Sequence, residues 1–179
     1  MQELKDTQSE TDTRNISIDR VGVKGLRFPI QIQDKLNRIQ STVATVSLAV
    51  DLPEEFKGTH MSRFVEALHQ HGPLLDVHTA LAIPRELLRR LSARRSHVEM
   101  EFPFFRAKNA PVTGIEGLMD YVVRFEMEAE ADNKLADFKL TVVVPVTTPL
   151  FQGHERLWGP QPARAGHLLR ALRLPARLD

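Results

Sequence analysis

Cysteine is absent from this chain of 179 residues, its formal net charge is only +1, and it has no long apolar run. The absence of cysteine excludes disulfides, thiolate metal ligands and a cysteine nucleophile. The nearly balanced charge gives no reason to expect nucleic acid or an acidic membrane surface as a partner. No apolar stretch approaches the ~20 residues that cross a bilayer, so a membrane partner is not expected either. The length fits one ordinary domain with a core.

Apolar residues are also scarce at the N-terminus. Residues 1–15 are rich in Gln, Glu, Asp and Thr and have almost nothing to bury. This composition is typical of a disordered or loosely docked polar arm. The segment lacks the apolar centre of a secretion signal, so we expect a cytoplasmic protein.

A predicted junction between a strand and a helix organises the first half of the chain. Residues 43–50 alternate, which places Ala44, Val46, Leu48 and Val50 on one face of a strand. Thr59 is a suitable N-cap for a helix that runs to about residue 71. The buried stripe of that helix is expected to contain Met61, Phe64, Val65 and Leu68.

Basic and polar residues gather where this helix is expected to begin: Lys57, His60, Ser62 and Arg63. The first turn of a helix has unpaired N–H groups and the positive end of the dipole, which together suit an anion such as phosphate. The alternative is that these residues are solvated surface groups of the first turn. Composition and spacing alone do not separate the two.

The remaining pattern predicts strands on both sides of a helical region. Residues 16–33 form a long strand whose phase changes near Gly22 and Gly25, which indicates a bulge. A second helix is expected to begin near Pro84, with leucines inward and arginines on a face that is either solvated or a subunit contact. Alternating residues around 98–104, 121–129 and 138–146 predict further strands. The expected order is β-β-α-α-β-β with one of the later strands split, an α+β fold with both helices on one face of an antiparallel sheet.

Three segments together resemble the type IB, or alternative prokaryotic, GTP cyclohydrolase I family. The first is Lys-Gly-Thr-His-Met-Ser-Arg-Phe at residues 57–64, and the second is the predicted strand at residues 18–30. The third is Val-Pro-Val-Thr-Thr at residues 144–148, which in that family continues into Cys-Pro-Cys-Ser-Lys. The resemblance covers roughly residues 8–148 in the right order.

This resemblance implies a tunnelling fold (T-fold), with the first of two modules at residues 16–148 and the second missing. It implies that GTP is converted to 7,8-dihydroneopterin triphosphate and formate, with zinc or another divalent metal as cofactor. It also implies a homo-oligomer joined through sheet edges. Lys57, His60 and Arg63 become candidate triphosphate contacts and Ser62 a candidate hydrogen-bond donor. The family's metal-binding cysteine and histidine lie beyond residue 148, so we expect no catalytic residue and no metal in this chain.

The tail, residues 149–179, differs in composition from the rest of the chain. It is rich in Leu, Arg, Ala, Pro and Gly and contains no Val, Ile, Ser, Thr, Asn or Lys. It shows no strand alternation, and Leu168, Leu169 and Leu172 suggest at most a short helix that ends at Pro175. The histidines before the tail, which are His60, His69, His71, His78 and His97, show no metal-ligand spacing.

An altered reading frame explains this tail. Residues 149–163 can be encoded so that dropping one base gives Pro-Cys-Ser-Lys-Gly-Met-Ser-Asp-Tyr-Gly-Ala-His-Asn-Gln. This resembles the family segment that should follow Val-Pro-Val-Thr-Thr. The hypothesis is therefore an aberrant, out-of-frame tail after Thr148. Two alternatives stay open: a non-catalytic nucleotide-binding or self-assembly module, and a structural domain whose likeness to the family is idle.

Overall fold

The computed structural model describes residues 17–33, 38–54, 58–109, 113–132, 136–148 and 164–176; for 136, 145–148 and 164–176 only the backbone is described. The predicted polar arm, Lys57 and residues 149–163 and 177–179 of the tail lie outside these ranges. The described elements, in chain order, are β1 (Ile18–Gln33), β2 (Ile39–Leu52), α1 (Met61–Gln70), β3 (Leu74–Leu75), α2 (Val77–Leu91), β4 (Arg95–Asn109), β5 (Glu116–Glu130), β6 (Ala136–Thr148) and β7 (Arg164–Ala176).

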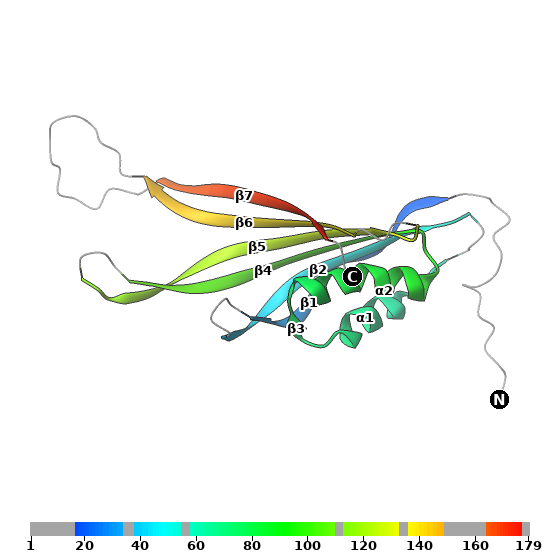
Figure 1. The fold of residues 1–179 in the computed structure, drawn as a ribbon, viewed down its shortest axis with the longest axis horizontal. Coiled ribbons are helices and arrows are strands. Elements are labelled where there is room, and N and C mark those ends of the chain that lie inside the picture. The colour runs from blue at the N-terminus through cyan, green and yellow to red at the C-terminus, as the bar shows by residue number, and fades with distance from the viewer. Residues whose placement is uncertain are drawn as a thin grey trace.

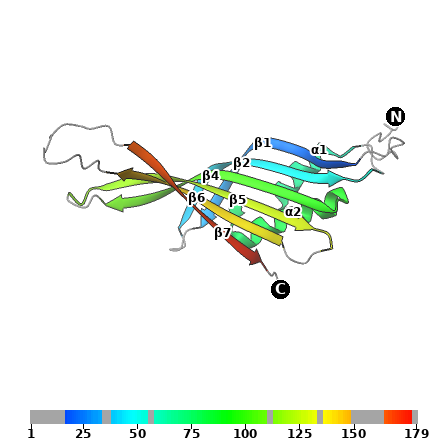
Figure 2. The ribbon, with the colours of Figure 1, turned by 90° about the horizontal axis from the view of Figure 1, so that it is seen from above.

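These strands form one sheet with both helices on the same face. The strand order is β3-β1-β2-β4-β5-β6-β7, and each neighbouring pair is antiparallel except β3 beside β1. Figure 1 shows α1 and α2 beneath one half of the sheet, while the β4–β5 and β6–β7 hairpins extend past them. Figure 2 shows the twist of the sheet from above. The predicted α+β architecture is confirmed, and the arrangement is that of a T-fold-like module.

The predicted bulge in the first strand is present. The register of β1 against β2 shifts between Ile18 and Val21 and again between Val23 and Leu26. Gly25 lies in the second shift with φ 73°, a left-handed conformation that glycine adopts without steric cost. Gly22 is needed for space instead, because a Cβ there would lie 1.9 Å from the Leu48 carbonyl oxygen.

The N-cap of helix α1 lies one residue later in the chain than predicted. His60 is the N-cap with extended backbone, and it makes no capping hydrogen bond from its side chain. The prediction of Thr59 as N-cap is therefore wrong. Phe64 and Leu68 are buried as expected, but Met61 is 44% exposed and Ala67 is buried in its place. The buried face of α1 is therefore formed by Phe64, Ala67 and Leu68.

Helix α2 begins well before Pro84. Asp76 is its N-cap and forms a capping box with Thr79, since Asp76 Oδ1 accepts from Thr79 N at 2.7 Å and Thr79 Oγ1 accepts from Asp76 N at 2.8 Å. The pKa of Asp76 is lowered first by the backbone N–H of Thr79 and then by its hydroxyl. Pro84 lies inside the helix, so the prediction that it marks the first turn is wrong. Neither α1 nor α2 is long and apolar enough to span a bilayer.

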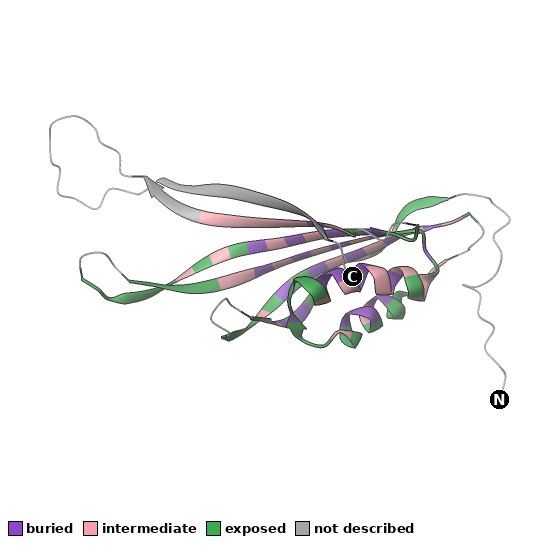
Figure 3. Ribbon diagram, viewed as in Figure 1, coloured by how far each residue is buried: buried purple, intermediate pink, exposed green. Residues whose placement is uncertain are grey.

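The core lies between the helices and the strands that they cover. Its buried residues include Val46 and Leu48 of β2, Phe64 of α1, and Met100 and Met127 of β4 and β5. Figure 3 shows buried positions alternating along these strands and exposed ones at the far end of the β4–β5 hairpin. The alternation predicted for β2, β4 and β5 is thus confirmed.

Two strands were not foreseen. The two-residue β3 lies between the helices, and β7 lies in the tail. The three segments predicted after the helices are three separate strands, β4, β5 and β6, and none of them is split. The tail contains β7, which pairs with β6 from Ala136 opposite Ala176 to Thr148 opposite Arg164. The suggestion of a short helix near Leu168 is therefore wrong.

Candidate functional site

The candidate anion site is the first turn of α1. His60 is its half-buried N-cap, with φ −79° and ψ 108°, and its carbonyl accepts from Arg63 N at 3.1 Å. Ser62 and Arg63 follow in the exposed part of the turn. The structure therefore brings together His60, Ser62 and Arg63, while Lys57 lies outside the described residues. No acidic residue lies in this turn, which leaves the positive dipole end uncompensated.

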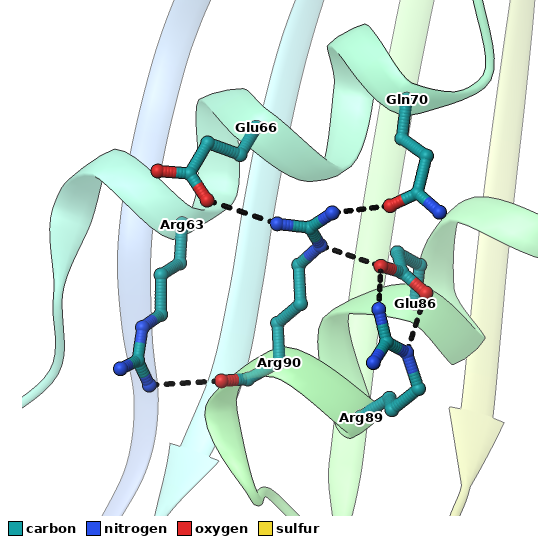
Figure 4. Close-up of polar contacts among 6 residues, drawn as sticks. All are labelled: Arg63, Glu66, Gln70, Glu86, Arg89 and Arg90. Carbon is teal, nitrogen blue, oxygen red and sulfur yellow. Dashed lines mark hydrogen bonds and ion pairs between the residues drawn. The ribbon is translucent and has the colours of Figure 1, made fainter.

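The Arg63 side chain is engaged with the other helix. Its Nη1 donates to the Arg90 backbone carbonyl at 2.9 Å. That carbonyl lies in the last turn of α2, where the helix ends at Ser92 in a left-handed conformation. A cation beside the negative end of a helix dipole is stabilising. Figure 4 shows this guanidinium directed at α2. Arg63 therefore joins the start of α1 to the end of α2.

Arg90 is the centre of a polar seam between the helices, a feature that the sequence analysis missed. Its Nη1 donates to Glu66 Oε2 at 2.9 Å, its Nη2 donates to Gln70 Oε1, and its Nε donates to Glu86 (Figure 4). Its side chain is only 23% exposed. The spacing of Glu66 and Gln70, four residues apart on α1, is the signal that identifies a shared acceptor face.

Glu86 is the half-buried carboxylate of this seam, with 10% of its side chain exposed. It accepts from Arg89 Nε at 2.9 Å and Nη2 at 2.6 Å, in addition to Arg90. The hydrogen bond from Arg89 lowers the pKa of Glu86 to about 2, with Arg90 acting in the same direction against the effect of burial. The arginine face of α2 was predicted to be solvated or a subunit contact. Arg90 on this face instead forms the contact between the two helices.

The face of the sheet away from the helices has its own ion pairs. Arg124 Nη2 pairs with Glu101 Oε2 at 2.5 Å, and Lys139 Nζ with Glu126 Oε2 at 2.7 Å. The hydrogen bond to Glu101 raises the pKa of Arg124. These are cross-strand pairs between β4, β5 and β6, and they leave this face polar and half-exposed.

A hollow of about 500 Å³ lies at the ends of β1, β2, β4 and β5. Its lining includes Asp19, Asp51, Arg95 and Glu130. Asp51 Oδ1 accepts from the backbone N–H groups of Arg94 and Arg95 at 2.9 and 2.7 Å, so that this carboxylate holds the start of β4. None of His60, Ser62 and Arg63 lines this hollow.

The donor groups in the described part of the chain do not fit a catalytic zinc. The sequence has no cysteine, and the described residues contain no group of three or more His, Asp or Glu side chains placed to hold a metal. His97 Nδ1 lies 2.9 Å from Glu128 Oε1, and the His69 ring packs edge-on against Phe28. A catalytic zinc needs about three protein ligands and an open position.

The fold, a largely antiparallel sheet with two helices on one face, is that of an α+β, T-fold-like module. Residues 4–149 match the family model of the type I GTP cyclohydrolase FolE2. The chain therefore belongs to this family.

Individual relatives give the same result. A GTP cyclohydrolase FolE2 of Akkermansia muciniphila is 97% identical over 148 residues, which are 83% of this chain and 56% of that protein. The proteins of the same name from Fervidobacterium nodosum and Azoarcus sp. are 46% and 43% identical over 145 residues, which are 55% and 54% of their lengths. The chain spans about half the length of the curated relatives it matches. The family match stops where the tail begins.

Proposed function

We propose that residues 16–148 are the first T-fold module of a GTP cyclohydrolase of type IB. The complete protein would convert GTP and water to 7,8-dihydroneopterin triphosphate and formate, the first step of folate and other pterin biosynthesis. The match of residues 4–149 to the FolE2 family model carries this proposal. The 97% identity to a relative named GTP cyclohydrolase supports it, and the reading as an unrelated binding module has no comparable support.

The chain as it stands is proposed to carry out no turnover. A zinc or other divalent ion, when bound, supplies an activated water to such a hydrolysis. The groups that would hold it are absent from this sequence before residue 149, since there is no cysteine, and the described histidines do not converge. We attribute this to an out-of-frame tail at residues 149–179.

Metal content tests this assignment without reference to activity. The chain would be compared with a frame-restored chain, in which Thr148 is followed by the Cys-Ser-Lys … Tyr-Gly-Ala-His-Asn-Gln sequence. After dialysis against zinc and then against metal-free buffer, we expect about one zinc per frame-restored chain and none in this chain. A stoichiometric zinc in this chain would contradict the proposal.

The triphosphate is proposed to bind at the first turn of α1, with contacts from Lys57 and His60 and a hydrogen bond from Ser62. Backbone N–H groups and the dipole end support this role. Arg63 differs from the other three, because its guanidinium already donates to the Arg90 carbonyl at 2.9 Å. A contact from Arg63 to phosphate requires that hydrogen bond to be exchanged.

Titration with GTP, followed by protein fluorescence or calorimetry, distinguishes these roles. His60→Ala and Ser62→Ala are expected to weaken binding by about three- to tenfold each, as for a lost hydrogen bond of about 1 kcal/mol. Arg95→Ala, a charge change remote from α1, serves as the control. Unchanged affinity in both His60→Ala and Ser62→Ala would remove the site from this turn.

The protein is also proposed to self-associate through strand edges and to be cytoplasmic. The β1 edge supports association, because β3 pairs with it only at Gln31 and Ile32. The location rests on the pterin chemistry of the family and on the absence of cysteine from the sequence.

A further inference from the structure

Strand β6 would be an edge strand without the tail. On one side it pairs with β5, from Asp137 opposite Glu128 to Val143 opposite Val122. On the other side β7 pairs with its whole length, Ala136–Thr148. In the described part of the chain β7 is the last strand of the sheet. The tail therefore occupies backbone groups that would otherwise lie open to another chain.

The β6 edge suits a second copy of itself. Its apolar residues alternate symmetrically about Val142, with Phe138 and Leu140 on one side and Val144 and Val146 on the other. In an antiparallel pair centred on Val142, Leu140 of one copy lies opposite Val144 of the other. Apolar positions then meet apolar positions on one face, as in stable cross-strand pairs, and the contact is the self-complementary kind that two-fold dimers use.

Strand β7 offers a poorer edge than the one it occupies. Its sequence contains Arg164, Arg170, Arg173 and Pro175. Charged residues and proline on an outer strand discourage further pairing, because proline has no N–H to donate and the charges repel a second copy. Leu174, Leu172 and Leu168 lie in register with Phe138, Leu140 and Val144, so that three apolar positions of β6 face apolar positions of the tail, while Val142 lies opposite Arg170.

We propose that β7 is an intramolecular edge cap: it occupies the β6 edge and thereby prevents two copies of the chain from pairing through β6. The partner excluded is a second copy of this chain, in antiparallel register about Val142. The cap uses only strand pairing, so it is independent of GTP binding and of the proposed function.

A chain that ends at Thr148 tests the cap. Its mass would be measured by light scattering across a concentration range beside the full chain. We expect about twice the mass of the full chain at high concentration, whatever association the two share through other edges. Equal masses, with far-UV circular dichroism showing that both are folded, would overturn the proposal.

Two further variants keep the test decisive. Replacing residues 164–176 in the full chain by a Gly/Ser segment of equal length removes the strand pattern without shortening the chain, and it is expected to give the same doubling. In the shortened chain, Thr141→Lys with Val143→Lys sets lysines opposite lysines in the β6 pair and is expected to return the mass to that of the full chain. Thr45→Lys, at an exposed position of β2, is the control. A dimer that survives the paired lysines would place the contact elsewhere.

Discussion

The two sides of the sheet are held in different ways. On the β1–β2 side, two helices cover the strands, and Val46, Leu48 and Phe64 are almost fully buried. On the β6–β7 side, Leu140 and Val142 are only partly buried, and the last strand is held by backbone pairing with β6. The first side lies wholly within the family match, whereas the last strand of the second lies beyond it.

This difference shows that an unrelated sequence can replace a strand of the sheet but not a catalytic centre. Strand pairing uses N–H and C=O groups that every residue but proline supplies, so an unrelated segment can complete a sheet. A metal centre needs particular side chains at particular places. The tail that we propose to be out of frame would therefore extend this fold through strand pairing and still leave it without the metal chemistry proposed for its family.

The largest difference between the two sides of the sheet is expected in how much a large-to-small substitution lowers the free energy of unfolding. Phe64→Ala removes a ring with no exposed surface, and we expect a loss of about 3–5 kcal/mol in the free energy of unfolding. Val142→Ala on β6 should cost about 1 kcal/mol, because this side chain is partly exposed. Urea unfolding of both variants measures the contrast. Equal losses would show that the two sides are packed alike.

Two glycines of β1, Gly22 and Gly25, give the next contrast. Gly22→Ala would place a Cβ 1.9 Å from the Leu48 carbonyl oxygen, and we expect a loss of about 3 kcal/mol as the backbone of β1 and β2 moves apart. A Cβ at Gly25 would have no atom within 4 Å, so Gly25→Ala should lower the free energy of unfolding only by the cost of a left-handed non-glycine residue, about 1–2 kcal/mol. Thermal unfolding should therefore show the larger fall in Tm for Gly22→Ala; the reverse order would be inconsistent with this close approach.

A smaller effect is expected from the seam between the helices, and it depends on pH. The folded-state pKa of Glu86 is depressed to about 2 from 4.5, so its contribution to stability is present above pH 4.5 and lost as the pH falls through about 2. Glu86→Gln should flatten the stability profile in this window. Glu116→Gln, an exposed change, is the control. If Glu86→Gln leaves the profile as steep as in the parent chain, the seam does not hold the carboxylate ionised.

Much of the fold was predictable from the sequence because hydrophobic alternation is a strong local signal. The buried rows of β2, β4 and β5 and the bulge near Gly25 follow from it. Helix boundaries were less predictable. Asp76 and Thr79 form a capping box that replaces the expected start at Pro84, and proline is tolerated inside α2.

The candidate site was predictable only in part. The clustering of His60, Ser62 and Arg63 is local, so the sequence indicates it. The hydrogen bonds from Arg63 to the Arg90 carbonyl and from Arg90 to Glu66 and Gln70 join segments 20 or more residues apart. The spacing of Glu66 and Gln70 indicates a shared acceptor face on α1, but no local pattern identifies Arg90 as its partner. Strand β7 was missed because its pairing is fixed by the available edge of β6 and not by an alternation of its own.

Turnover of GTP by this chain and by the frame-restored chain, side by side with added zinc or manganese, tests the central claim most directly. The product would be followed as the fluorescent pterin formed after oxidation. The account predicts turnover by the frame-restored chain alone. Turnover by this chain as it stands would contradict it, because the catalytic groups would then lie within residues 1–148.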